Sequence, residues 1–321
     1  MTAARVVTMG VHVLDVLCRP VEEIPEGQGG ALVDEIRVTA AGTAGGTALT
    51  LAKLGADVCS AGAIGTDAAG DMLVMLLGRA GVDTRQLVRR DDVQTSASVL
   101  PIRPNGDRPS FHVIGANATY GPDDVDWDAV GTARHLHLGG PELVAGGADA
   151  AAAILAGARE RGLTTSIDVL APGDLLAMLG ETLGPVWPLV DHALPNDEQA
   201  LALTGAATVD EAARELLGRG AGCVAIACGA DGALVATADG VTRVPAYAVD
   251  VVDTTGCGDA FSAGFLAGVT LGRSPVEAAT LGCAAAAQVA QGLGSDHGAF
   301  DLAALDAFAT TAASAPTAPA S

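Results

Sequence analysis

A glycine-rich segment in the last third of the chain combines an anion-binding pattern with a carboxylate. It reads Asp253-Thr254-Thr255-Gly256-Cys257-Gly258-Asp259, and apolar residues at helical spacing follow from Phe261 to Val269. Gly256–Gly258 is therefore predicted at a helix N-terminus, where unpaired backbone N–H groups and the helix dipole favour an anion. Asp259 falls in the first turn and is a candidate proton acceptor for an attacking hydroxyl. The plainer alternative is a glycine loop with an ordinary helix-start Asp.

A second glycine cluster, Ala41-Gly42-Thr43-Ala44-Gly45-Gly46-Thr47, also leads into a helical pattern. It does not match G-x-G-x-x-G, and no acidic residue follows a matching strand at the expected distance, which disfavours a dinucleotide fold. The chain also lacks a G-x-x-x-x-G-K-[ST] segment. Lys53, its only lysine, is predicted to be a solvated residue on the helix surface. A Walker-type kinase is thereby excluded.

The elements that must position these loops alternate along the chain. Short β-branched segments are separated by Ala- and Leu-rich segments of helical length, which is typical of a mostly parallel sheet with helices on both faces. The candidate strands are Arg5–Gly10, Val58–Ile64, His135–Leu138, Thr164–Val169, His192–Pro195 and Val224–Cys228, and the candidate helices are Gly46–Leu54, Gly70–Ala80, Gly147–Arg161, Asp210–Gly218, Gly258–Leu271 and Pro275–Gln291.

Two stretches depart from this alternation and predict a small separate sheet. Residues 95–115 indicate two strands joined around Asn105-Gly106, a dipeptide that accepts positive φ at both centres of a tight turn. Two more strands are expected near residues 12–18 and 31–39. Such a sheet must cover a substrate cleft or a partner's sheet. We expect one domain over residues 1–315, with lid strands near 12–18, 31–39, 95–103 and 108–115, and a flexible tail at 316–321.

The overall charge limits the partners. The chain has 321 residues with 17 Lys+Arg against 38 Asp+Glu, a formal charge of -21. This balance repels nucleic acids and anionic membrane surfaces, so a phosphorylated ligand would depend on backbone N–H groups, arginines and bound cations. The six cysteines form no C-x-x-C pair, which argues against structural zinc or a disulfide framework. The N-terminal apolar run is too short to span a bilayer, and we expect a cytoplasmic protein.

The two glycine motifs together resemble a known family. DTTGCGDAF with its following helix resembles the C-terminal signature of the ribokinase-like, PfkB-type carbohydrate kinases, and AAGTAGGTALTLAKLGADVCSAGAIGTDAAG resembles their N-terminal signature. The resemblance extends from about Val6 to about Ser295. It implies a ribokinase-like three-layer α/β/α sandwich with a small β-sheet lid, and ATP-dependent transfer of the γ-phosphoryl group to a hydroxymethyl group of a sugar or sugar derivative.

The resemblance also implies roles for single residues. Asp259 would be the general base, and the backbone of Gly256, Cys257 and Gly258 would form the anion hole. Substrate would contact Asp15, Gly42, Gly46 and Asn117, and the nucleotide would contact Asn196, Gly229, Gly232 and Thr254. Asp253, Thr255 and Gly294 would hold a monovalent cation such as K⁺. Mg²⁺ would accompany ATP, and two lids would pair into a homodimer.

Three positions depart from the family's pattern. Gly46 stands where sugar-binding members usually have Asn, Gln199 replaces the Glu of N-x-x-E, and Ala227 replaces a frequent Thr. The missing amide at Gly46 and the missing carboxylate at Gln199 would alter contacts with substrate and magnesium. Because Asp259 and the glycines are intact, we interpret the changes as tuning of specificity.

Other interpretations stay open on the sequence alone. A nucleoside kinase of the same family is one, although few aromatic side chains could stack on a base, with Phe111 and Tyr120 nearest the lid. A non-catalytic protein that senses sugars or nucleotides is another, suggested by the departures at Gly46 and Gln199. His135 and His137 share one strand face and are interpreted as a structural pair. The lid side chains Arg103, Arg108 and His112 either reach a substrate phosphate or carboxylate or face solvent.

Overall fold

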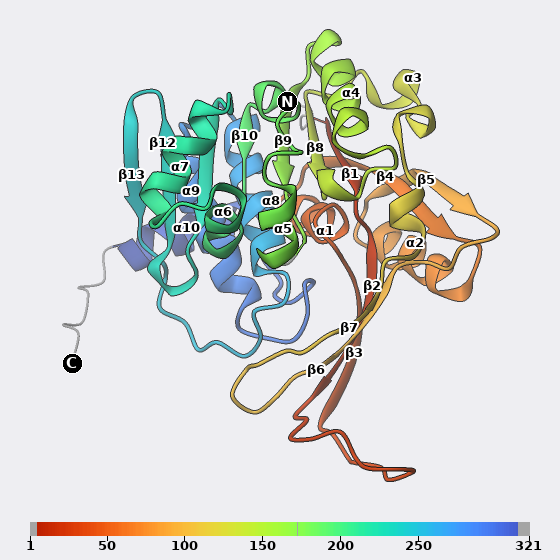
Figure 1. Ribbon diagram of the computed structural model, residues 1–321. Coiled ribbons are helices and arrows are strands. Elements are labelled where there is room, and N and C mark those ends of the chain that lie inside the picture. Colours follow the sequence, from red (N-terminus) through yellow and green to blue (C-terminus); the bar gives the residue numbers. More distant parts are fainter. Residues whose placement is uncertain (1–4, 172, 314–321) are drawn as a thin grey trace.

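The computed structural model describes residues 5–171 and 173–313, in which nine strands form one sheet in the order β13-β12-β11-β10-β9-β8-β1-β4-β5 (Figure 1). Pairing is parallel from β5 to β11 and antiparallel from β11 to β13. The predicted, mostly parallel sheet is confirmed. Its strands are β1 (Arg5–Gly10), β4 (Asp57–Gly65), β5 (Asp83–Arg90), β8 (His135–Gly139), β9 (Thr164–Asp168), β10 (His192–Ala193), β11 (Cys223–Ala227), β12 (Ala233–Thr237) and β13 (Gly240–Val244).

Helices cover both faces of this sheet because its strands are apolar on both sides. Val6 and Val7 of β1 belong to two different hydrophobic cores, one on each face. One core includes α1 (Gly45–Lys53), α2 (Ala68–Arg79), α8 (Cys257–Thr270), α9 (Pro275–Val289) and α10 (Leu302–Ala313). The other includes α3 (Trp127–Val130), α4 (Gly147–Glu160), α5 (Gly173–Leu179), α6 (Asp197–Thr204) and α7 (Val209–Gly218). Short 3-10 helices lie at Gly115–Thr119, Pro122–Asp124, Pro141–Leu143, Trp187–Leu189 and Gly229–Asp231.

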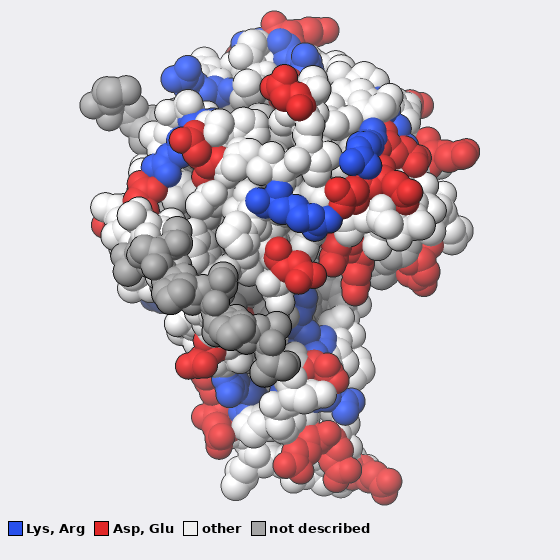
Figure 2. Space-filling model, turned by 90° about the vertical axis from the view of Figure 1, so that its left-hand side faces the viewer, with Lys and Arg blue, Asp and Glu red and all other residues white. Residues whose placement is uncertain are grey.

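The second sheet projects from the body of the molecule as a lid (Figure 1). Its strand order is β3-β2-β6-β7, from β3 (Glu35–Ala41), β2 (Val13–Arg19), β6 (Ala97–Pro101) and β7 (Phe111–Val113). The pair β2–β6 is parallel and the outer pairs are antiparallel. Figure 2 shows acidic side chains spread over this face, with basic ones among them, including at its lower end. The single domain over residues 1–315 stays a prediction, and the predicted tail at 316–321 lies outside the described residues.

Two details of the lid prediction are wrong. The strand expected from residue 31 begins at Glu35, because Leu32 is fully exposed and unpaired in the sheet. The chain does turn at Asn105-Gly106, where the N–H of Gly106 donates to the carbonyl of Arg103 at 2.9 Å, but the turn has another type than expected. Among the described residues only glycines have positive φ, so Gly106 has it, at 88°, and Asn105 does not. The strands on either side are shorter than predicted, and prolines at 104 and 109 lack the N–H that a ladder needs.

The register of the lid sheet sorts its side chains onto two faces. Because side chains alternate along a strand, residues paired in one row share a face and the next row faces the other way. The row containing Asp15 and Ser98 is polar and includes residues that line the cavity described below, whereas Val99 and Phe111 are 48% and 62% exposed on the opposite face. The rows are Thr39–Asp15–Ser98–His112 and Val38–Val16–Val99–Phe111.

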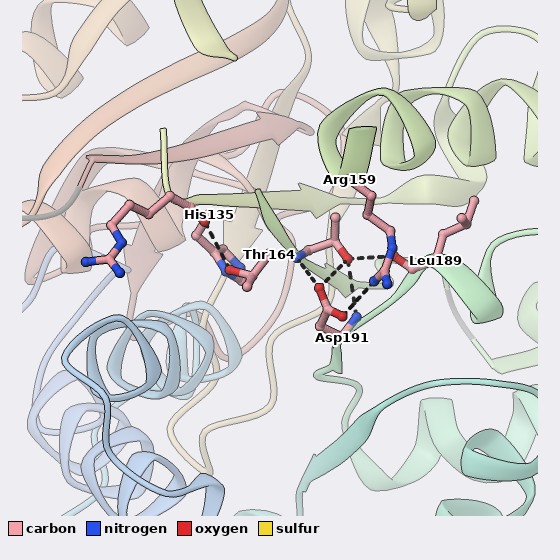
Figure 3. A network of polar contacts seen from close by, with 7 residues as sticks. His135, Arg159, Thr164, Leu189 and Asp191 are labelled. Carbon is pink, nitrogen blue, oxygen red and sulfur yellow. Dashed lines mark hydrogen bonds and ion pairs between the residues drawn. The ribbon is translucent and has the colours of Figure 1, made fainter. Parts of the chain in front are cut away.

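Polar side chains connect neighbouring strands of the main sheet, and one ion pair ties α4 to the segment before β10. His135 Nδ1 lies 2.6 Å from Thr164 Oγ1, and Arg159 forms a 2.6 Å ion pair with Asp191 (Figure 3). His135 Nε2 and His137 Nδ1 both contact Ser166 Oγ, at 2.7 and 2.8 Å. The interpretation of the two histidines as a structural pair is therefore confirmed.

No helix within residues 5–171 and 173–313 has the length and apolar composition that crossing a bilayer requires.

Candidate active site

A cavity of about 660 Å³ lies between the lid and the carboxyl ends of the main-sheet strands. Open α/β sheets bind ligands at this edge, so the cavity occupies the expected place for a site. Lid strands supply one wall, and the loop before α1, the end of β9 and the N-termini of α6 and α8 supply the others. Of the predicted site residues, the cavity is lined by Asp15, Gly42, Asn196, Thr254, Thr255, Gly256, Gly258 and Asp259.

The N-terminus of α8 opens onto this cavity. Gly256 is the N-cap with φ 77°, and a Cβ there would lie 2.5 Å from the Cα of Ser295, so only glycine fits. At Gly258 no atom lies within 4 Å of the Cβ position, which leaves the backbone accessible. The N–H of Cys257 donates to the carbonyl of Thr254 at 3.2 Å, within the turn. The helix terminus therefore presents an open, positively polarised backbone to the cavity.

Cys257 itself is unsuited to nucleophilic chemistry. Its thiol donates to the carbonyl of Ala286 at 3.7 Å, and burial raises its pKa to about 12. The thiolate that a nucleophile needs is therefore absent near neutral pH. Only the main chain of Cys257 remains a candidate for the site.

Asp259 lies in the first turn of α8, at the floor of the cavity. Burial raises its pKa to about 7, the charge of Asp15 acts in the same direction, and the guanidinium of Arg108 opposes both. A carboxyl group with this pKa exchanges its proton near neutral pH. Its position beside the helix N-terminus and its pKa both suit a general base.

Gly46 lies against Asp259 and is not among the residues that line the cavity. A Cβ at Gly46 would come within 2.7 Å of Asp259 Cγ and 2.9 Å of its Cβ. Thr47, the next residue of α1, places its Oγ1 3.4 Å from the carbonyl of Asp259, to which it donates. The absence of a side chain at position 46 therefore gives the Asp259 carboxylate its place.

Two of the four predicted substrate residues line the cavity and two do not. Asp15 lines the cavity at 6% exposure, and burial raises its pKa to about 6. Gly42 lines it too, with φ 88°, and a Cβ there would lie 2.7 Å from the carbonyl of Val11. Asn117 does not line it: its Oδ1 accepts from the N–H of His12 and its Nδ2 donates to the carbonyl of His12, both at 3.0 Å. The amide of Asn117 is thus occupied by the backbone.

Two of the four predicted nucleotide residues line the cavity as well, and two do not. Asn196 lines the cavity as the N-cap of α6 and forms a capping box with Gln199, with both bonds at 2.8 Å. Gln199 Nε2 also donates to the carbonyl of Val169 at 2.8 Å, so the residue that replaces Glu stabilises the start of the helix. Gly229 and Gly232 lie outside the cavity lining, in the turn between β11 and β12 with φ 54° and 86°.

The three residues of the predicted monovalent-cation site come together. Asp253 is 1% exposed, and its Oδ1 accepts from Thr255 N at 2.9 Å and Thr255 Oγ1 at 2.8 Å. Its Oδ2 accepts from the N–H of Gly294 at 3.0 Å. Within the described residues, no Lys, Arg or His forms an ion pair with this buried carboxylate. Asp253 thereby connects the loop before α8 to the 292–295 loop.

The prediction of a solvated Lys53 is wrong. Its Nζ donates to the carbonyls of Asp296, His297 and Gly298 at 2.7, 2.8 and 2.9 Å, and lies 5.0 Å from the ring centroid of Phe300. Burial lowers its pKa to about 8. The reason is tertiary, because the loop after Gly294 turns three carbonyls toward the end of α1. The one lysine therefore fastens the loop whose Ser295 packs against Gly256 at the N-terminus of α8.

Asp168 is a cavity residue that sequence reasoning missed. It ends β9, is 6% exposed, and accepts from Ser262 Oγ at 3.3 Å. Burial raises its pKa well above the ordinary range, and the charge of Asp259 adds to the shift. The available signal was its place at the carboxyl end of a predicted parallel strand, where such folds bind ligands. Ser98 and Ser110 of the lid were missed as well.

Taken together, a doubly covered parallel sheet, a lid, and a carboxylate beside an open helix N-terminus define a phosphotransferase with an alcohol group as acceptor. Residues 4–300 match the profile described as pfkB family carbohydrate kinase. The chain belongs to this family of kinases.

Individual relatives agree with this assignment. The ATP-dependent ribose-1-phosphate kinase of Halopiger xanaduensis is 33% identical over 265 residues, which cover 82% of this chain and 84% of that protein. A ribokinase from Arabidopsis thaliana, solved with ribose and ATP, superposes with a TM-score of 0.81 at 21% identity, covering 96% of this chain and 99% of that one. A candidate ribokinase II from E. coli, solved with ATP and Mg²⁺, superposes at 0.84 with 23% identity and the same coverages. The predicted ribokinase-like sandwich with its lid is confirmed.

Proposed function

We propose that the protein is an ATP-dependent sugar kinase that transfers the γ-phosphoryl group to a hydroxymethyl group of a sugar or sugar derivative. The observation that carries this proposal is the carboxylate of Asp259 in the first turn of α8, beside the open backbone of Gly256–Gly258 and inside the lidded cavity. Burial holds the pKa of Asp259 at about 7, so the group is a competent base near neutral pH.

In the proposed reaction the acceptor lies under the lid against Asp15 and Gly42. Asp259 takes the proton of the acceptor hydroxyl as the new O–P bond forms, and ADP leaves with the electrons of the broken P–O bond. The backbone N–H groups of Gly256–Gly258 and the dipole of α8 stabilise the negative charge on the group in transit. Positioning and charge stabilisation supply most of the rate in such transfers.

For the nucleotide, we propose contacts from Asn196 and Thr254, which line the cavity, with Gly229 and Gly232 bordering it from the β11–β12 turn. Mg²⁺ would neutralise charge on the ATP phosphates. Glu198 fits a role beside it, because this carboxylate lines the cavity at the start of α6 and has no ion-pair partner among the described residues.

A monovalent cation such as K⁺ would fit beside the anion-hole loop. Asp253 is a buried carboxylate without a basic partner in the described part of the chain, and it already gathers Thr255 and Gly294. A bound cation would balance that charge and hold the loop in place.

The nucleoside-kinase alternative is less well supported. Among the described residues that line the cavity there is no Phe, Trp or Tyr. Phe111 lies on the outer face of the lid, and Tyr120 is in the core at 2% exposure. A base would find no Phe, Tyr or Trp ring to stack on, and only the imidazole of His112, which favours a sugar.

The two departures that suggested a non-catalytic sensor have structural explanations. Gly46 leaves room for the catalytic carboxylate, and Gln199 caps α6. Neither removes a group on which the proposed transfer depends.

We also propose that the lid pairs with the lid of a second copy. Ile36, Val99 and Phe111 are 67%, 48% and 62% exposed on its outer face, and the register places Val99 and Phe111 side by side. Burying such a patch stabilises association. Light scattering should show a dimer that Phe111→Asp dissociates, and a wild-type monomer at high concentration contradicts the pairing.

A phosphorylation screen tests the proposal. Pentoses, hexoses, sugar phosphates and nucleosides are each offered with ATP and Mg²⁺, and ADP release is measured. Turnover on a sugar or sugar phosphate is expected. Preference for nucleosides would favour the alternative kinase, and thermal stabilisation by sugars without turnover would favour the sensor.

A further inference from the structure

Arg108 is the one lysine or arginine, within residues 5–171 and 173–313, that lines the main cavity. It lies on the lid loop between β6 and β7, and its Nε donates to Thr254 Oγ1 at 3.2 Å. In the described structure its two terminal nitrogens have no hydrogen-bond or ion-pair partner. The lid therefore holds a guanidinium by one edge and leaves its terminal N–H groups free.

The surroundings of Arg108 are acidic. Asp15, Asp168, Glu198 and Asp259 also line the cavity. The charge of Arg108 lowers the pKa of Asp15 and of Asp259, against the stronger effect of burial. The guanidinium therefore acts electrostatically on both carboxyl groups. An anionic acceptor would be repelled from this cavity without the guanidinium.

The lid adds neutral hydrogen-bonding groups beside the guanidinium. Ser98, Ser110 and His112 line the cavity, and Ser98 Oγ lies 3.0 Å from His112 Nδ1. Partial burial lowers the pKa of His112, so the ring is neutral at pH 7. A free guanidinium edge with hydroxyl and imidazole groups nearby matches the oxygens of a phosphate.

We propose that Arg108 determines acceptor specificity by binding a phosphate that the acceptor sugar already carries. The inference rests on the proposed function and narrows its acceptor to phosphorylated sugars with a free hydroxymethyl group. The transferring phosphoryl group has its own anion site at Gly256–Gly258. Arg108 instead reaches the cavity from the lid, which also bears Asp15.

The test compares matched acceptors in wild type, Arg108→Ala and Arg108→Lys, with Arg103→Ala as the control. Arg103 belongs to the same loop but does not line the main cavity. The acceptor pairs are ribose 1-phosphate with ribose and fructose 6-phosphate with fructose. The quantity measured is the ratio of kcat/KM for the phosphorylated member to kcat/KM for the neutral one, together with KM.

Wild type should prefer one phosphorylated acceptor by about 100-fold or more, as expected for a charge-assisted contact. Arg108→Ala should lower that preference about 100-fold, mainly by raising KM for the phosphorylated acceptor. Arg108→Lys should recover part of the preference, because lysine keeps the charge but lacks the paired N–H donors of the guanidinium. The ratio should be unchanged in Arg103→Ala.

Two results would overturn the inference. One is a wild-type enzyme that prefers the neutral sugars. The other is an Arg108→Ala variant whose kcat falls equally for both members of a pair, which would assign the guanidinium to the transferring group.

Failure of the proposed function looks different, since wild type would then phosphorylate no acceptor. Calorimetric titration with the same two sugar phosphates then tests the phosphate contact without turnover. The contact is overturned if wild type and Arg108→Ala bind these ligands with equal affinity, or if neither protein binds them.

Discussion

Replacing Gly46 with alanine should displace the Asp259 carboxylate and slow phosphoryl transfer. The added Cβ would lie 2.7 Å from Asp259 Cγ and 2.9 Å from Asp259 Cβ. Carbon atoms pack at about 3.5–4.0 Å, so the carboxylate must move by roughly 1 Å, or α1 must separate from α8. A displacement of that size in a catalytic group costs about 100-fold in rate, equivalent to about 2.7 kcal/mol in the barrier.

The assay measures kcat for the best acceptor of the screen, through coupled detection of ADP release at saturating ATP. Gly46→Ala should lose about 100-fold in kcat while calorimetry still shows ATP binding. Gly46→Asn should do no better, because its Cβ meets the same atoms. Gly78→Ala in α2 is the matched control, since nothing lies within 4 Å of its Cβ position. A folded Gly46→Ala enzyme with kcat within twofold of wild type would refute the reasoning.

Four further perturbations test the ionisation of Asp259 and the contacts of Lys53 and Asn117. The kcat/KM profile should rise with pH through about 7, where Asp259 loses its proton, whereas an acid limb at pH 4–5 contradicts a raised pKa. Because the folded protein keeps the Asp259 proton where the unfolded chain has lost it, the free energy of unfolding falls as the pH rises from about 4 to about 7. Asp259→Asn removes this effect and should stabilise the fold at pH 8 by about 1 kcal/mol or more in urea titrations. Lys53→Met should lose about 2 kcal/mol of unfolding free energy by removing charge-assisted bonds to three carbonyls, with Lys53→Arg as the control; an unchanged urea midpoint contradicts it. Asn117→Ala should lose about 2 kcal/mol, and a raised acceptor KM at wild-type stability would instead place Asn117 in the site.

The parts of the site that were predictable are encoded locally. The glycines before α8 and the apolar spacing after them are neighbours in sequence, so the helix start and the place of Asp259 follow from a few residues. The polar row of the lid follows less directly, since it needs the register of strands far apart in the chain. Asp15 was assigned through family resemblance, and Ser98 beside it was missed.

The parts that were not predictable depend on tertiary contacts. Lys53 meets carbonyls more than 240 residues away, and Gly46 meets Asp259 across two helices. Nothing near either residue in sequence signals the partner. Asn117 has the type and setting of a ligand-binding residue, yet the backbone of His12 takes both ends of its amide.

Missed strands have a compositional cause. The edge strand β5, with sequence DTRQLVRR, buries only Leu87 fully, so it lacks the apolar run that identified the central strands. The hairpin β12–β13 begins with Ala233 and contains Ala236, and alanine favours strands weakly. Antiparallel pairing with β11 and packing against α9 place these residues in the sheet.

Turnover by Asp259→Asn tests the central claim most directly. The substitution keeps the size of the side chain and removes its basicity, so the acceptor hydroxyl loses its proton acceptor. We predict a fall in kcat of about 1,000-fold or more, with ATP binding by calorimetry retained. Near-normal turnover in a folded Asp259→Asn protein would contradict the account of Asp259 as the general base.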